Sequence, residues 1–140
     1  MSETEHTGRC LCGEIRYRAT GAPKWIANCH CESCRRATGA PLATYAGFAV
    51  ERFACLAGAP AHFHSSPGVT RSFCGRCGTP LTYEGARWPG EVHVLIGTMD
   101  RPQDFWPTRD AFAEEKLPWC IVQAGPAPED RPWRGVTLRV

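Results

Sequence analysis

The sequence lacks both the long apolar runs of membrane proteins and the strong positive charge of nucleic-acid-binding domains. No segment approaches the roughly 18 consecutive apolar residues that a membrane-spanning helix requires. Sixteen lysines and arginines stand against fourteen acidic residues, which leaves a formal net charge of +2. The composition therefore gives no indication of a membrane or nucleic-acid partner.

The first residues lack the features of a secretory signal. Residues 1–8, MSETEHTG, contain neither a basic region nor an apolar stretch. We therefore expect a cytoplasmic protein, and this compartment keeps thiols reduced. The chain nevertheless contains nine cysteines, an odd number that does not suit a closed set of disulfides. Metal binding is the favoured explanation.

Short segments of alternating polarity, separated by turns rich in glycine and proline, predict an antiparallel, mainly all-β fold. Residues 14–19 place Ile15, Tyr17 and Ala19 on one face, which is typical of a half-buried strand. Further strands are predicted to end at Cys29 and to cover residues 42–48, 51–58, 61–66, 70–74, 79–84 and 91–98. Short helical turns are predicted within residues 31–39, ended by Gly39, and near residues 102–105.

The length of 140 residues is typical of one domain. We assign residues 9–122 to this domain, residues 1–8 to a flexible N-terminal tail and residues 123–140 to a C-terminal extension. The extension contains the charged, proline-rich segment APEDRPWRG.

Seven of the nine cysteines lie in three tight clusters, which is typical of metal ligands. The clusters are Cys10-Leu11-Cys12, Cys29 with Cys31 and Cys34, and Cys74-Gly75-Arg76-Cys77. Two cysteines, Cys55 and Cys120, stand apart. We interpret these two as small buried apolar residues, the usual environment of a free cysteine.

The C-x-x-C pair Cys74 and Cys77 predicts half of a closed zinc site. A short turn lets two thiolates face one ion, and a structural zinc has four ligands, so we expect Cys10 and Cys12 to complete the set. Joining positions 12 and 74 costs roughly 3.7 kcal/mol in loop entropy, plus a constant. Structural zinc supplies about 10–16 kcal/mol of apparent binding energy. In the competing arrangement, Cys10 and Cys12 join two of the other three clustered cysteines and leave the third stranded.

The remaining cluster, here called the trio, predicts a second zinc site with an open position. The trio consists of Cys29, Cys31 and Cys34. His30 lies between two of them, so an extended segment would point it the opposite way. Three protein ligands and an open place are the mark of a catalytic zinc, and a sulfur-rich centre favours a soft fourth ligand such as a substrate thiol. The alternative is a fourth protein ligand from His62, His64 or Cys120.

Four segments of the chain carry motifs that are specific in combination, although each motif alone is weak. They are GRCLCGEIRY, CHCESCRRATGAPLATY, SSPGVTRSFCGRCGTPLTY and EKLPW. Together they resemble the glutathione-dependent formaldehyde-activating enzyme (GFA) family, also called the centromere protein V/GFA domain family. The resemblance covers residues 8–119. It implies a small β-tent of stacked sheets, a structural zinc at the four cysteines and a second zinc at the trio.

The resemblance also implies a carbon–sulfur lyase with zinc as its cofactor and the trio as its catalytic centre. The family activity forms or cleaves S-hydroxymethylglutathione, the adduct of glutathione and formaldehyde. Because glutathione carries carboxylates, we expect arginine donors nearby. Arg35 and Arg36 follow the trio directly and are the predicted substrate-binding residues, with solvated surface charge as the alternative role. Arg71 is ranked below them.

One departure from the family pattern concerns the substrate. Family members commonly carry His-x-Trp shortly before the proline–tryptophan pair, whereas this chain has Asp110-Ala111-Phe112. If this stretch shapes the pocket, the substrate is a related thiol adduct rather than the glutathione–formaldehyde adduct.

A non-enzymatic function is the alternative to the lyase. Zinc-binding β-tent proteins also serve as protein-binding modules, and a fold alone does not decide function. An open position at the trio distinguishes the two, because a binding module has no need of one.

Overall fold

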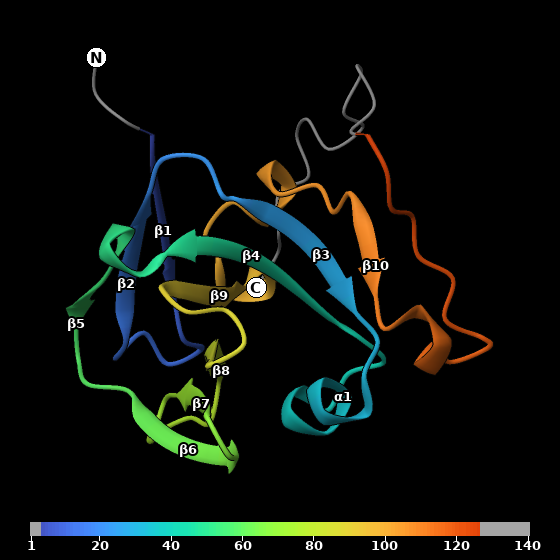
Figure 1. Cartoon of the computed structure of the whole chain (residues 1–140). Helices are drawn as coiled ribbons and strands as arrows, with labels where there is room; N and C mark the ends of the chain where they lie inside the picture. The colour runs from blue at the N-terminus through green and yellow to red at the C-terminus, as the bar shows by residue number, and fades with distance from the viewer. Residues whose placement is uncertain (1–3, 127–140) are drawn as a thin grey trace.

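The computed structural model describes residues 4–126, which form two β-sheets (Figure 1). The smaller sheet has three antiparallel strands in the order β1-β2-β5. These strands are β1 (Glu5–Arg9), β2 (Arg16–Thr20) and β5 (Phe53–Ala57). The mainly all-β fold predicted from the sequence is therefore confirmed.

The larger sheet has seven strands in the order β10-β3-β4-β9-β8-β7-β6. Among the described residues, β10 and β3 form its only parallel pair, and its other neighbouring strands are antiparallel. Its strands are β3 (Trp25–Cys29), β4 (Ala43–Ala49), β6 (Ala61–Ser66), β7 (Val69–Phe73), β8 (Pro80–Gly85), β9 (Glu91–Leu95) and β10 (Arg109–Ala111). The described helical elements are α1 (Glu32–Thr38) and the 3₁₀ turns η1 (Val50–Arg52), η2 (Ile96–Thr98), η3 (Pro102–Asp104) and η4 (Ala113–Glu115). The helical turns predicted within residues 31–39 and near residues 102–105 correspond to α1 and η3.

The main core lies between the two sheets. Ile15, Tyr17 and Ala19 are all buried, as the alternation of residues 14–19 predicts, and they pack in one cluster with Phe48 and Val94 of the larger sheet. Burying an apolar side chain of this size contributes about 1.5–3 kcal/mol. This shared core holds the small sheet against the large one.

The predicted N-terminal tail is wrong for residues 5–8. These residues belong to β1, which pairs with β2 along its whole length, from Glu5 opposite Thr20 to Arg9 opposite Arg16. The strand is polar and only Gly8 in it is buried, so it carries no apolar alternation that a sequence pattern could reveal. Its order comes from pairing with β2. Residues 1–3 lie outside the described part of the chain.

The two isolated cysteines differ in burial. Cys120 is buried, as predicted, but Cys55 is exposed, which contradicts the prediction. Cys55 lies in β5, an edge strand of the small sheet, where it pairs with Tyr17 of β2. Within β5 only Phe53 is partly buried and packs against the core, and the four residues after it are exposed, so the core ends at the start of this edge strand.

Within residues 4–126, no helix is both long and apolar enough to cross a membrane. The predicted C-terminal extension over residues 123–140 lies mostly outside the described residues, which end at position 126.

Candidate metal centres and an adjoining cavity

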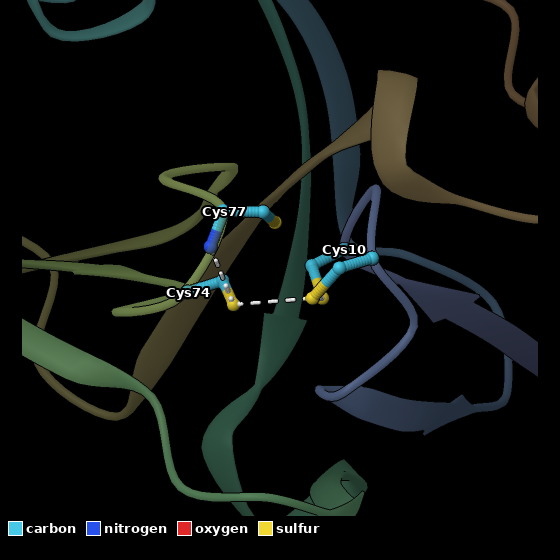
Figure 2. Close-up of side chains that lie close together, drawn as sticks. Cys10, Cys74 and Cys77 are labelled. Atoms are coloured by element: carbon cyan, nitrogen blue, oxygen red, sulfur yellow. Dashed lines mark hydrogen bonds between the residues drawn. The ribbon is translucent and has the colours of Figure 1, made fainter.

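Four cysteines from two distant turns form the first cluster. Cys10 and Cys12 lie between β1 and β2, and Cys74 and Cys77 lie between β7 and β8. Their four sulfur atoms all lie within 4.8 Å of one another. Figure 2 shows side chains of the two turns pointing toward each other. The structure therefore brings together the four residues that the sequence paired.

The sulfur spacing of the first cluster fits a metal ion better than a disulfide. The Cys12 sulfur lies 3.5 Å from that of Cys10 and 3.8 Å from that of Cys74. A tetrahedral site with zinc–sulfur distances of about 2.3 Å places its sulfurs about 3.8 Å apart. All nine cysteines are free of disulfides. The first cluster can therefore hold a metal ion.

Backbone amides and a hydroxyl group contact three of the four sulfurs in the first cluster. The Ile15 amide donates to the Cys10 sulfur at 3.3 Å, and the Cys77 amide donates to the Cys74 sulfur at 3.4 Å. The Thr79 hydroxyl lies 3.2 Å from the Cys77 sulfur, and this hydrogen bond is the largest cause that lowers the Cys77 pKa to about 5. Hydrogen bonds to the charged form stabilise it, and the thiolate is the form that binds metals.

The trio forms the second cluster at the junction of β3 and α1. Cys29 ends β3, Cys31 is the N-cap of α1, and Cys34 lies in the first turn of the helix. The three sulfurs lie within 4.8 Å of one another, and the Cys29 thiol donates to the Cys31 sulfur at 3.4 Å. The second cluster can therefore also hold a metal ion, as the C-H-C-x-x-C spacing predicts.

None of the other described histidine, cysteine or acidic side chains joins the trio. The predicted alternative ligands His62 and His64 lie instead next to Ser72, at 2.9 Å, and Thr70, at 3.1 Å. Zinc usually has four ligands. A zinc ion held by the three thiols alone would therefore have one coordination position left for another ligand.

The helix α1 is short and is defined at both ends by its caps. The Cys31 sulfur accepts a hydrogen bond from the Cys34 amide at 3.3 Å, in the manner of an N-cap side chain. Gly39 adopts a left-handed conformation, with φ of 67°, and its amide donates to the Arg35 carbonyl. The predicted end of the helix at Gly39 is confirmed, although the helix is longer than the single turn that was predicted.

Cys34 lies in a positively polarised environment. The Tyr45 hydroxyl donates to its sulfur at 3.5 Å, and the Arg71 guanidinium lies 3.8 and 3.9 Å away. The hydrogen bond from Cys29 is the largest cause that lowers the Cys34 pKa to about 5; burial opposes it, while Tyr45 and Arg71 add to it. Arg71 also donates to the Tyr45 oxygen at 3.3 Å. The trio therefore favours negative charge at Cys34.

His30 turns away from the sulfurs of the trio, as the alternation of an extended segment predicts. Its side chain is fully buried, and its Nε2 atom lies 2.8 Å from the Asp110 carboxylate. Asn28 donates to the same carboxylate at 3.3 Å, and these contacts, led by the His30 hydrogen bond, lower the Asp110 pKa. The His30 amide donates to the Ala111 carbonyl at 3.0 Å. Asp110 and Ala111 thus fix the position of His30, which lies between Cys29 and Cys31.

The two predicted substrate-binding arginines have different roles. Arg35 donates to the His30 carbonyl at 2.6 Å and to the Glu115 carbonyl at 2.8 Å, so it supports the backbone. Arg36 is exposed, donates to Glu32 at 2.9 Å and lines a cavity beside the trio. Arg71, which the sequence ranked lower, lines this cavity and reaches Cys34. Arg71 precedes the Cys74–Cys77 pair in the sequence, which left open which of the two sites it reaches, and the fold places it at the trio.

The cavity has a volume of about 860 Å³, and all three trio cysteines line it. This volume is at the upper end of the range typical of small-molecule sites, about 300–1,000 Å³. Ala111 and Phe112 also line it. The stretch in which the chain departs from the family motif therefore does shape the cavity.

These features define a small β-domain protein with two cysteine clusters that can bind metal ions, one of which lines a cavity of ligand size. A sequence model of the family described as glutathione-dependent formaldehyde-activating enzyme matches residues 5–115. The chain belongs to this family, as its cysteine motifs predict.

The fold also occurs in a solved structure. A crystal structure of a Rhodobacter sphaeroides protein is similar with a TM-score of 0.62 and 20% sequence identity, and the match covers 75% of this chain and 99% of that chain. At this identity the similarity concerns the fold alone. No curated protein sequence matches the chain.

Proposed function

We propose that the protein is a zinc-dependent carbon–sulfur lyase that acts on a glutathione-type thiol adduct. The reaction is the formation or cleavage of S-hydroxymethylglutathione or of a related adduct of a thiol and an aldehyde. The observation that carries the proposal is the trio of thiols on the wall of a cavity, without a fourth side-chain ligand among the described residues. Family membership supplies the expected thiol and aldehyde.

Two zinc sites with different roles belong to this proposal. Cys10, Cys12, Cys74 and Cys77 would hold a structural zinc, since four thiolates close the site. Cys29, Cys31 and Cys34 would hold the catalytic zinc. When bound there, zinc supplies a place for the substrate sulfur as a thiolate, because a coordinated thiol loses its proton. Cysteines bind zinc only in the reduced state, which agrees with the proposed cytoplasmic location.

The reaction transfers no electrons to or from a cofactor. In the forming direction the substrate sulfur bonds to the aldehyde carbon, the carbonyl electron pair moves to oxygen, and the proton that leaves sulfur is balanced by one taken up at oxygen. In cleavage the hydroxyl loses its proton, the carbonyl forms again, and the carbon–sulfur bond breaks with its electron pair on sulfur. The chain has to orient the two partners and stabilise negative charge on sulfur, and both effects reduce the barrier.

Arg71 and Tyr45 are the residues placed to stabilise that charge. Arg71 is half-buried, reaches the Cys34 sulfur and donates to Tyr45, which itself donates to Cys34. A cation at this place offsets the excess negative charge of three thiolates and a substrate thiolate. Arg36, exposed on the cavity wall, is the proposed partner for a substrate carboxylate.

The decisive experiment is the Cys31→Ser variant. Serine keeps an N-cap oxygen for α1, so the variant should fold and retain the structural zinc while it loses the second zinc and thiol-dependent activity. The measurements are zinc content, a thermal melt and an assay with glutathione and formaldehyde. The exposed Cys55→Ser variant is the matched control and should behave like the wild type.

Two outcomes would contradict the proposal. Full activity in Cys31→Ser would remove the trio from the mechanism. A wild-type protein that holds zinc at the trio but shows no activity with any thiol would favour the alternative function, a protein-binding zinc module.

A further inference from the structure

One wall of the cavity is built from aromatic rings around His93. The ring centroid of His93 lies 4.4 Å from that of Trp25, 5.3 Å from that of Tyr83 and 5.6 Å from that of Trp88. All four residues line the cavity. We call these four residues the aromatic wall.

Two polar atoms of the aromatic wall have a partner outside the cavity lining. Glu91 accepts a hydrogen bond from the Trp25 indole at 3.1 Å and lies 3.0 Å from the His93 Nε2 atom. Glu91 itself is not among the residues that line the cavity. Arginines that line the cavity lie over three of its rings: Arg71 over Tyr83 at 5.1 Å, Arg87 over Trp88 at 5.3 Å and Arg109 over Trp25 at 5.6 Å from the ring centroid. The wall therefore presents aromatic rings together with guanidinium groups to the space beside the trio, and such a surface binds an aromatic group through ring stacking and cation–π contact.

Two further phenylalanines face the same cavity from opposite ends of the larger sheet. Phe63 lies in β6 and Phe112 follows β10, the two edge strands, and their exposed fractions are 61% and 40%. Phe112 has a left-handed backbone, with φ of 54°, the only positive φ at a described residue other than glycine. Backbone strain of this kind at a bulky residue is costly and is found mostly where function requires it.

A hydroxymethyl group is too small and too polar to use this surface. It carries one carbon and a hydroxyl, and it would sit at the sulfur, beside the trio. The peptide part of glutathione is anionic and suits arginines rather than aromatic carbon. The aromatic wall and the two exposed phenylalanines thus remain without a partner in the adduct after which the family is named.

We propose that the thiol adduct bound in this cavity carries an aromatic group derived from an aromatic aldehyde, which packs between the aromatic wall and Phe112. This inference rests on the proposed function. The bond changes are those of the lyase reaction above: the thiol sulfur bonds to the carbonyl carbon, and the proton lost from sulfur is balanced by one gained at oxygen. Arg36 remains available for a carboxylate of the thiol.

The test compares the binding of stable thioether analogues to the zinc-loaded protein by titration calorimetry. S-benzylglutathione should bind about tenfold or more tightly than S-methylglutathione, because only the benzyl group buries a ring against the wall. S-hexylglutathione should fall between them. Trp88→Ala and Phe112→Ala should each remove most of the benzyl preference and leave the affinity for S-methylglutathione unchanged. Trp119→Ala, which removes an exposed tryptophan outside the cavity lining, is the control and should leave all three affinities unchanged.

The outcomes separate this inference from the proposed function. Equal affinities for the benzyl and methyl analogues, or a hexyl analogue that binds as tightly as the benzyl one, would overturn the aromatic substrate. A benzyl preference that persists in both Trp88→Ala and Phe112→Ala would do the same. Unmodified glutathione tests the proposed function by itself: if it does not bind to the wild type, or binds equally to Cys31→Ser, the lyase proposal fails.

Discussion

Cys10 and Cys74 are almost completely buried, yet each sulfur accepts a backbone hydrogen bond. Buried thiolates are stable only with such partners and a counter-charge. A metal ion bound to the first cluster would provide the counter-charge, and its loss would leave negative sulfurs, or protonated thiols in close contact, inside the core. Each of these cysteines therefore matters for stability as well as for metal binding.

We predict that Cys74→Ser lowers the free energy of unfolding by more than about 4 kcal/mol or prevents folding, since metal binding here is folding energy. The measurement is urea unfolding together with zinc content. Cys55→Ala is the matched control because Cys55 is exposed, and it should change stability by no more than about 0.5 kcal/mol. A soluble Cys74→Ser variant with normal unfolding would show that this cluster is not structural.

Asp110 is the second residue whose role can be tested. Its removal leaves the buried His30 without its carboxylate partner. We predict that Asp110→Ala costs about 1–3 kcal/mol at neutral pH, as for a lost partner of a buried polar group. The exposed Glu114→Ala variant is the control. If Asp110→Ala and the wild type have equal free energies of unfolding, Asp110 does not stabilise the segment that contains His30.

The pH dependence of the same contact has a definite sign. The Asp110 pKa is lowered in the folded protein, first by the hydrogen bond with His30. A carboxyl of this kind stabilises the fold above its unfolded pKa, and the contribution is lost as the pH falls through the folded pKa. The stability difference between wild type and Asp110→Asn should therefore be largest near neutral pH and shrink in acid. A difference that grows on acidification would contradict the assignment.

At the scale of elements, the pairing of β3 with β4 positions the aromatic wall. Trp25 lies opposite Gly47, and its indole covers the place where a Cβ atom of residue 47 would be. Gly47 is thus required because the ring packs directly on the backbone, and any side chain there would move the ring.

We predict that Gly47→Ala destabilises the fold by about 1–3 kcal/mol, as for an overpacked site, and weakens binding of S-benzylglutathione more than that of S-methylglutathione. Urea unfolding and calorimetry measure the two effects. Gly97→Ala is the control, because no atom lies within 4 Å of a Cβ at Gly97 and its φ is not positive. If both variants behave alike, Trp25 does not depend on this contact.

The helix α1 has seven residues, and a helix of this length is not stable alone in water. Its conformation depends on the Cys31 cap, the Gly39 end and the contacts of Arg35 with two backbone carbonyls. The trio is therefore built on a local element that can lose order without breaking the shared core of the two sheets.

At the scale of the whole molecule, the first cluster connects the two sheets. Cys10 and Cys12 belong to the turn of the small sheet, whereas Cys74 and Cys77 belong to a turn of the large sheet. The trio, in contrast, lies within one end of the large sheet and α1. Metal at the first cluster should thus hold the tertiary structure together, and metal at the trio should not.

We predict that a chelator removes zinc in two steps. The trio, with fewer protein ligands, should release its metal first, with loss of activity but an unchanged near-ultraviolet circular dichroism spectrum. Release from the first cluster should coincide with unfolding. The measurement is a chelator titration followed by zinc release and circular dichroism in parallel. Release of both ions in one step with unfolding would contradict the division into catalytic and structural sites.

Short-range chemistry made much of this protein predictable from its sequence. The spacing of the cysteines determines which sulfurs can approach one ion, because a turn of two to four residues has few conformations. The alternation around Tyr17 determines which face of β2 is buried, because side chains of a strand alternate. The end of α1 follows from Gly39, since glycine adopts a left-handed conformation without strain.

Only the tertiary structure decided the features that depend on distant segments. The strands β1 and β10 have no apolar pattern of their own and are ordered by their partners. Cys55 is exposed because β5 is an edge strand, and Arg71 rather than Arg35 reaches the trio because β7 lies on the same sheet as β3. The aromatic wall joins residues from β3, β8 and β9 with Trp88 between them. Such contacts depend on strand order and packing, which no local spacing encodes.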